Sequence, residues 1–263
     1  MLIKWSEKAS YSFSAPVCDL AVDLRMQCLA VWGRTAVVDL VTVTPEPAAR
    51  KATSDIFGNA VIELTFDRPV QRLVVSGYHR ASCCAEEPFA APLLPMDLAL
   101  EDEARKENST IGRGDPTVSL HDVATIVREV RRGWRYNASI TGLRRPLSDI
   151  DASRRGVCQD IARLAVDLMR RRGIPARYVV GYAVPRDRRI RVLRHAWIAA
   201  HVDGGWREVD VADLRDELRP LAATAWGSAL AAIGPVIGRS PVRAQTQLTV
   251  DAQAELENKP TAG

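Results

Sequence analysis

A cysteine at the start of a predicted helix constrains the fold of this chain more than any other feature. Downstream of Cys158, apolar residues recur at three- and four-residue spacing, which is typical of a helix with one buried face. These residues are Ile161, Leu164, Ala165, Leu168 and Met169. Arginines at 170–172 and Gly173 then favour a helix end, because cations stabilise the negative end of the dipole and glycine terminates helices. The sequence therefore predicts a helix that begins at Cys158.

The N-terminus of a helix is a favourable place for a reactive thiol. The first backbone N–H groups have no partner within the helix, and the positive end of the dipole lies there. Both favour a thiolate, which is the nucleophilic form of cysteine. A cysteine beside an apolar helix face is more commonly a core residue. A catalytic interpretation of Cys158 therefore needs partner residues elsewhere in the chain.

Two residue types that a thiol nucleophile needs follow Cys158 in order. His195 opens a strand-like stretch, and a turn signal at 203–205 precedes a second stretch that ends near Asp210. The pattern predicts a β-hairpin in which the Asp210 carboxylate holds the His195 ring in one tautomer. A two-residue turn at 204–205 would place Asp210 opposite Ala199, roughly 13 Å along the strand from His195. A bulge, a strong twist or a wider loop would then have to close the gap.

Four motifs in this order carry a family resemblance. They are GVCQDIA at 156–162, GIPARYVVGY at 173–182, HAW at 195–197 and GWREVD at 205–210. The chain resembles the bacterial branch of the transglutaminase-like superfamily, many of whose members are regarded as cysteine proteases. Upstream, DIFGN at 55–59 resembles the Asp-x-Phe-Gly-Asn turn in the β-rich N-terminal region of that branch. One departure is Val211-Ala212 after Asp210, where the family often has Pro-Thr.

The resemblance implies a fold and a set of catalytic roles. The fold is α+β: a β-sandwich-like N-terminal module precedes a papain- or transglutaminase-like core, in which the helix that begins with the nucleophile packs on an antiparallel sheet. Carried over position by position, the family's nucleophile falls on Cys158, its general base on His195 and its orienting carboxylate on Asp210.

Strand and turn signals divide the chain into four parts. Residues 1–95 are rich in strand signals, which predicts a sandwich-like domain. Prolines and a charged run predict a linker over 96–115, and the family motifs fall in a catalytic core over 116–240. Residues 241–263 are expected to form a final strand and a frayed tail.

The same signals predict individual elements. Strands are expected at 35–43, 61–66 and 70–75, and a last strand at 244–250 that returns to a sheet, with fraying beyond Ala254. Helices are expected near 98–106, over 119–132 with Ser119 and Asp122 as capping residues, within a loop at 143–155, and over 222–232.

Composition and charge exclude several classes of protein. The hydrophobic content is 47%, and the sequence lacks the run of about 18 apolar residues that a membrane span needs. The N-terminus has no hydrophobic signal segment, so we expect a cytoplasmic protein without a membrane partner. A net charge of +4, from 36 basic and 32 acidic residues, does not indicate nucleic-acid binding. Five cysteines, two of them adjacent, do not form the pattern of a disulfide framework.

The sequence gives only weak signals for a metal site or for a general base other than His195. His79 with Cys83 and Cys84 lacks the ligand spacing of structural zinc, and we expect neither a metal nor a cofactor. His201 is a second candidate base, which ranks behind His195 because it lies beside the predicted turn.

Aromatic and basic residues around the motifs have a structural and a functional interpretation. Trp134, Trp197 and Trp206 are expected to be core residues, because large aromatics dominate burial. The arginine-rich stretch 186–194 leads to His195 and is either a solvated loop or a border of the active site that favours acidic substrate groups.

These features predict cysteine-dependent acyl transfer on a peptide, protein or other amide substrate. The Cys158 thiolate would attack the carbonyl to give an acyl-thioester, with the oxyanion held partly by the Cys158 backbone N–H. Deacylation by water makes a peptidase or amidase, and deacylation by an amine makes a transglutaminase or another acyltransferase. Hydrolysis is expected, because nothing in the sequence identifies an amine site. A non-catalytic binding module is the alternative of a different class, and the intact Cys, His and Asp argue against it.

Overall fold

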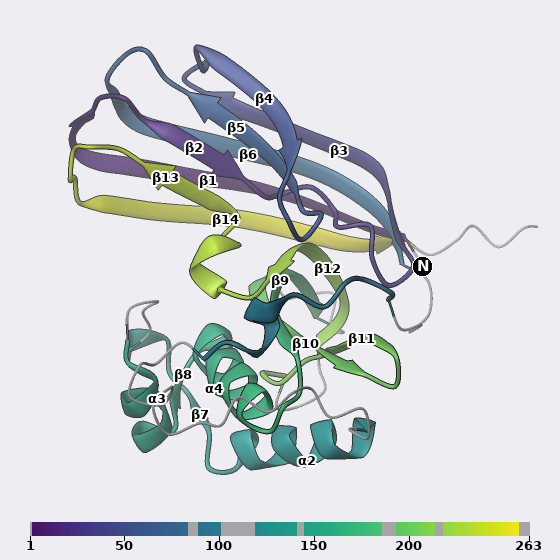
Figure 1. Ribbon diagram of the computed structural model, residues 1–263. Coiled ribbons are helices and arrows are strands. Elements are labelled where there is room, and N and C mark those ends of the chain that lie inside the picture. The colour runs from purple at the N-terminus through teal and green to yellow at the C-terminus, as the bar shows by residue number, and fades with distance from the viewer. Residues whose placement is uncertain are drawn as a thin grey trace, which may run out of the picture.

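The computed structural model describes residues 2–83, 89–100, 119–140, 145–185, 193–213 and 218–257. In these ranges two stacked β-sheets form a sandwich, and a third sheet packs against helices below it (Figure 1). The α+β fold predicted from the sequence is confirmed. No helix in the described ranges is long and apolar enough to cross a membrane.

The sandwich consists of two antiparallel four-stranded sheets, with the orders β14-β1-β6-β3 and β13-β2-β5-β4. The first sheet contains β1 (Leu2–Val17), β3 (Arg34–Thr44), β6 (Val70–Cys83) and β14 (Thr246–Glu257), and the second contains β2 (Ala21–Leu24), β4 (Ala49–Ser54), β5 (Ala60–Thr65) and β13 (Val236–Arg239). Apolar side chains such as Val22, Leu64 and Leu73 fill the space between the sheets. The strands predicted at 35–43, 61–66 and 70–75 are confirmed, to within one residue, as parts of β3, β5 and β6.

The C-terminal residues return to the sandwich. β13 pairs with β2, and β14 pairs with β1 from Phe13↔Thr246 to Leu2↔Glu257. The strand predicted at 244–250 is present but longer, and residues 255–257, which we expected to fray, belong to its ladder. The long strand β1 offers a continuous row of backbone partners, which accounts for the extension. Residues 258–263 lie outside the described part of the chain.

The third sheet is antiparallel and has the order β11-β10-β9-β12. Its strands are β9 (Ala176–Pro185), β10 (Leu193–Val202), β11 (Gly205–Val209) and β12 (Leu218–Gly227). Helix α4 (Cys158–Arg171) packs on β9 and β10, and helices α2 (Leu120–Arg131) and α3 (Leu147–Ser153) pack on α4. The short elements are β7 (Arg135–Tyr136), β8 (Arg155–Gly156), η1 (Pro95–Leu98), η2 (Ala138–Ile140) and η3 (Leu230–Ala232).

Helices α2 and α4 begin where the sequence predicts. At the start of α2, the Asp122 carboxylate accepts a hydrogen bond from the Ser119 backbone N–H at 2.9 Å. The sequence predicts that α4 buries one face, but in the structure α4 is buried on nearly every side. Arg170, which we expected to stabilise the end of α4, also binds residues outside the helix. Its Nη2 donates to the backbone carbonyls of Ala176 and Ser228, both at 2.8 Å.

The helix predicted over 222–232 is wrong. Strand β12 covers most of this range, and η3 forms its end. Alanine has a high helix propensity, but Ala222, Ala223 and Ala225 are fully buried in the third sheet, where Ala222 belongs to a hydrophobic cluster that also contains Trp5 of β1. Burial between two layers overrides the local preference. Of the helix predicted near 98–106, Leu98 is the last residue of η1 and residues 99–100 are not helical. Residues 101–106 lie outside the described part.

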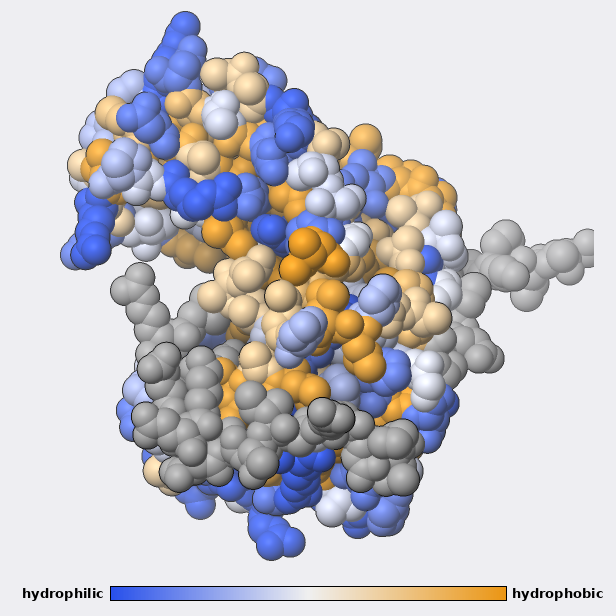
Figure 2. All heavy atoms as spheres, in the orientation of Figure 1, coloured by the Kyte–Doolittle hydropathy of each residue, from blue (hydrophilic) through white to orange (hydrophobic). Residues whose placement is uncertain are grey.

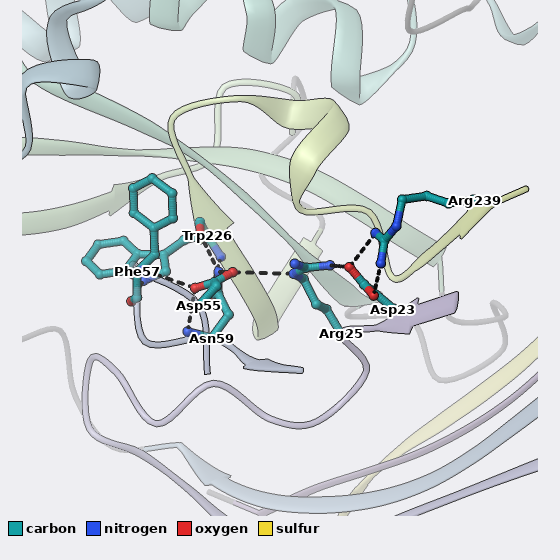
Figure 3. A network of polar contacts seen from close by, with 7 residues as sticks. All are labelled: Asp23, Arg25, Asp55, Phe57, Asn59, Trp226 and Arg239. Carbon is teal, nitrogen blue, oxygen red and sulfur yellow. Dashed lines mark hydrogen bonds and ion pairs between the residues drawn. The ribbon is translucent and has the colours of Figure 1, made fainter. Parts of the chain in front are cut away.

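The DIFGN turn docks the sandwich on the third sheet (Figure 3). Asp55 holds the turn together by accepting hydrogen bonds from the backbone N–H groups of Phe57 (3.0 Å) and Asn59 (3.1 Å). The Asn59 amide then pairs with both backbone groups of Trp226 in β12, at 2.7 and 2.9 Å. Arg25 extends the network from Asp55, as Figure 3 shows. The turn therefore has a structural role at the junction of the two layers.

Replacing Asn59 with alanine should destabilise the protein by on the order of 2–4 kcal/mol, because two buried backbone groups of Trp226 lose their partners. The free energy of unfolding from urea titration checks this. Ile56→Ala in the same turn is the control, since the Ile56 side chain is 70% exposed. Equal stability of the two variants would contradict the docking role.

Candidate active site

The residues around Cys158 hold it at the first position of α4. Asp160 is fully buried, and its carboxylate accepts a hydrogen bond from the Val157 backbone N–H at 2.9 Å. A side chain at Gly156 would collide with this carboxylate, so glycine is required there. The GVCQD segment therefore fixes the backbone on both sides of Cys158. Cys158 is only partly buried and lines a cleft.

The hairpin brings Asp210 to His195 by a register that differs from the predicted one. The two-residue turn is Asp203-Gly204, both at positive φ, and not 204–205. Because Ile198 pairs with Val209, Asp210 follows the strand end near Trp197, two residues from His195 rather than four. A diagonal neighbour at this spacing is within side-chain reach. The His195 Nε2 and Asp210 Oδ2 atoms lie 2.8 Å apart, without a bulge or a wide loop.

Backbone contacts and one arginine hold the Asp210 loop in place. The second carboxylate oxygen of Asp210 accepts hydrogen bonds from the N–H groups of Ala212 (3.0 Å) and Asp213 (3.1 Å). Arg131, at the end of α2, donates to the backbone carbonyls of Asp210 (2.6 Å), Val211 (3.1 Å) and Asp213 (2.9 Å). The sequence gives no signal for this contact, because Arg131 is one of several arginines near the end of its helix.

Replacing Arg131 with methionine should slow the alkylation of Cys158 by iodoacetamide about tenfold at neutral pH, because the Asp210 loop loses three hydrogen bonds and His195 its fixed partner. The matched control is Arg128→Met, since among the described residues Arg128 donates within its own helix, to Ala124 and Thr125. The rate is measured by mass spectrometry. Equal rates in the two variants would show that Arg131 does not position the site.

The ionisation of the pair is shifted toward an imidazolium and a carboxylate. Burial lowers the pKa of His195, but hydrogen bonds and charge interactions with Asp210 and Cys158 outweigh burial and raise this pKa to about 10. Burial raises the pKa of Asp210, but the hydrogen bond and charge of His195 and the two backbone N–H groups hold it below its ordinary value. Nε2 is engaged by Asp210, which leaves Nδ1 as the His195 atom for the contact with Cys158.

Cys158 and His195 open into one cleft of about 210 Å³. Its walls come from the start of α4, from β9, β10 and β12, and from the segment that follows η3. The lining residues include Gln159, Tyr182, Arg194, Thr224, Leu230 and Pro235. The structure therefore brings the three sequence-predicted site residues together, two of them in the cleft wall and Asp210 behind the His195 ring.

A second set of contacts supports His195 from the sandwich side. The Trp197 ring stacks on the His195 ring, with centroids 5.9 Å apart, and its Nε1 donates to Glu208 at 2.8 Å. Glu208 in turn binds Arg34 of β3 at 2.6 Å. Glu208 is thus committed to Arg34 and Trp197, and Asp210 is the carboxylate bound to His195.

Other candidates lie away from the cleft. His201 makes an edge-to-face contact with Trp206, and Trp134, Trp197 and Trp206 are buried, as predicted. His79 is hydrogen-bonded to Asp39 at 2.6 Å. The described ranges contain no group of His, Cys, Asp or Glu that could hold a metal ion, and Cys84 lies outside them.

Of the arginine-rich stretch 186–194, the structure describes only the last two residues. Residues 186–192 lie outside the described part. Arg194 forms an ion pair with Glu7 of β1, in which Nε and Oε2 lie 2.8 Å apart. At this position the positive charge is therefore neutralised by the sandwich.

Fold and site together resemble known proteins. Residues 105–211 match the transglutaminase-like superfamily, and residues 6–80 match the bacterial transglutaminase-like N-terminal region. A crystal structure from Cytophaga hutchinsonii, described as a putative cysteine protease, has the same fold, with a TM-score of 0.75 and 18% identity over 99% of this chain and 93% of that one. This family and fold support cysteine-dependent catalysis in general.

The chain belongs to the transglutaminase-like superfamily and carries the N-terminal region of its bacterial branch. An uncharacterised Mycobacterium leprae protein is 36% identical over 89 residues, which cover 32% of this chain and 32% of that protein. An uncharacterised Mycobacterium tuberculosis protein is 24% identical over 227 residues, 74% of this chain and 69% of that protein. The chain thus spans about a third of the length of the first relative.

Proposed function

We propose that the protein is a cysteine-dependent amidase or peptidase that works through an acyl-thioester. The observation that carries the proposal is the position of His195, which contacts both Asp210 and Cys158 while Cys158 occupies the first turn of α4. An imidazolium and a helix N-terminus each stabilise a thiolate. A merely structural cysteine needs neither.

The proposed reaction has two halves. The Cys158 sulfur attacks the carbonyl carbon of the amide, and the oxyanion is held partly by the Cys158 backbone N–H. His195 gives its proton to the leaving nitrogen as the C–N bond breaks, which leaves an acyl-thioester and a free amine. Water then attacks the thioester, His195 takes a proton from it, and the carboxylic acid and the thiol are released. Asp210 keeps the His195 ring oriented throughout.

Hydrolysis is the proposed outcome because Cys158 is partly exposed in the cleft, and none of the described residues in the cleft wall marks a site for an acceptor amine. Transfer to an amine, as in a transglutaminase, is the second candidate. It uses the same thioester and differs only in the group that attacks it.

Incubation of fluorescently labelled casein with and without an excess of a fluorescent primary amine tests the proposal. Hydrolysis predicts new peptide fragments or ammonia release, without incorporation of the amine, and loss of activity in Cys158→Ala. Incorporation of the amine would overturn hydrolysis in favour of transfer. If neither reaction occurs across a panel of unfolded proteins and no acyl-enzyme is detected by mass spectrometry, the enzymatic proposal fails.

A further inference from the structure

A second hollow opens at one edge of the sandwich. It has a volume of about 630 Å³, which lies in the range of ligand-binding sites. Its lining comes from β1 and β6 of one sheet, from β2 and β13 of the other, and from residues 240–246, which lead from β13 into β14. The apolar residues that line it include Tyr11, Phe13, Val17, Leu20, Val22, Leu73 and Val236. Tyr11, Phe13 and Val236 are only partly buried, so the hollow presents apolar surface to solvent.

This hollow adjoins the Cys158 cleft along one segment of the chain. Gly234 and Pro235 line the cleft, and Val236 and Gly238, which follow directly in β13, line the hollow. On the other side, Arg194 lines the cleft and is hydrogen-bonded to Tyr11, which lines the hollow. Figure 2 shows the surface hollowed between the sandwich and the helical part, with hydrophobic residues along the lower edge of the sandwich.

Three arginines border the hollow or its path to the cleft: Arg239, Arg194 and Arg243, of which Arg243 lines the hollow at an exposed position. Arg239 at its rim is bound by both carboxylate oxygens of Asp23, at 2.6 and 2.7 Å. Arg194, between hollow and cleft, is bound by Glu7. Two of the cations that border the path are therefore already neutralised by carboxylates of the sandwich. The walls offer burial of apolar side chains as the main source of binding energy.

The backbone between the hollow and the cleft could bind a peptide in an extended conformation. Strand β13 is an edge strand of its sheet in the part of the chain that the structure describes, and an edge strand can pair with an added extended peptide. β13 runs from Val236 to Arg239, a length of roughly 13 Å at about 3.3 Å per residue. Val236, Gly238 and Arg239, which line the hollow, lie within about five positions of Gly234 and Pro235, which line the cleft. An extended peptide alongside this segment would therefore place a side chain in the hollow about three to five residues from an amide at Cys158.

We propose that this hollow, the sandwich groove, binds an extended apolar segment of the polypeptide substrate whose reactive amide reaches Cys158 about three to five residues away. The proposal rests on the function proposed for Cys158. It makes the substrate a polypeptide with apolar side chains rather than a small amide. It also gives the sandwich a part in substrate choice.

Two hexapeptides with an N-terminal iodoacetyl group test the groove, one with leucines at positions three to five and one with asparagines there. The groove predicts that the leucine peptide alkylates Cys158 about tenfold faster than the asparagine peptide. Gly238→Trp should abolish this difference and leave the rate with iodoacetamide unchanged. A Cβ at position 238 would make only an ordinary contact, with Leu20 Cδ1 at 3.8 Å, and the residue is exposed. Val37→Trp, on an exposed site of the distant edge strand β3, is the control and should change neither rate.

The outcomes separate the groove from the nucleophile. Equal rates for the two peptides, or an advantage of the leucine peptide that persists in Gly238→Trp, would overturn the groove while Cys158 stays reactive toward iodoacetamide. An unreactive Cys158 would overturn the proposed function instead. The groove is then judged by fluorescence anisotropy of the labelled, unreactive leucine peptide on Cys158→Ala. Binding that Gly238→Trp removes would support the groove, and no binding would overturn it.

Discussion

Replacing Asp210 with asparagine is expected to reduce turnover of an amide substrate by about 10³- to 10⁴-fold, with the fold retained. The asparagine oxygen can still accept the backbone N–H groups of Ala212 and Asp213. Its NH₂ group would then face His195 Nε2, where the carboxylate oxygen now lies at 2.8 Å. A donor at this position favours the wrong tautomer and cannot stabilise an imidazolium.

The measurement is kcat on a substrate found with the casein assay. The control is Asp203→Asn in the hairpin turn, where asparagine tolerates the positive φ of 50°. Asp203→Asn should retain nearly full activity, and His195→Ala should have almost none. If Asp210→Asn matched the control while His195→Ala was inactive, the orienting role of Asp210 would be wrong.

Stability should fall as the pH rises from about 6.5 to about 10, because the His195 pKa is raised from its ordinary value of 6.5 to about 10 in the folded protein. A raised folded-state pKa means that the folded state holds the proton more tightly, so its contribution is fully present below about pH 6.5 and is lost as the pH passes through about 10. The expected loss is on the order of 2–4 kcal/mol, since His195 is only 8% exposed but strongly coupled to Asp210 and Cys158.

Urea unfolding of wild type and Asp210→Asn at several pH values in this window measures the effect. Wild type should lose more stability than the variant, which lacks the charged partner, so the two curves should converge as the pH rises. Curves that stay parallel would show that the His195–Asp210 pair does not hold the proton.

Local features of the site could be predicted from the sequence because local physics determines them. The start of α4 at Cys158 follows from the apolar spacing after it and from the arginines and Gly173 at its end. The hairpin between His195 and Asp210 follows from its turn signal. The turn signal at 203–205 does not say which two residues form the turn, and the structure places it at Asp203 and Gly204, both at positive φ, rather than at 204–205. This one-residue difference moves Asp210 two positions closer to His195.

Features that depend on distant packing could not be predicted. Ala222, Ala223 and Ala225 have helix-forming side chains, and only the layers that bury them make β12 a strand. The contact between Arg131 and the Asp210 loop joins residues about 80 positions apart, and the contact between Arg34 and Glu208 joins the sandwich to the third sheet. No periodicity or motif marks such pairs.

The central claim is that Cys158 is an activated thiol, and selective alkylation tests it most directly. Wild type is treated with limiting iodoacetamide at about pH 6, where an ordinary thiol is almost fully protonated, and modified peptides are mapped by mass spectrometry. Cys18, which is exposed, is the internal reference. Cys158 should react at least about tenfold faster than Cys18, and His195→Ala should remove this preference. Equal labelling of Cys158 and Cys18, unchanged by His195→Ala, would show that Cys158 is not activated.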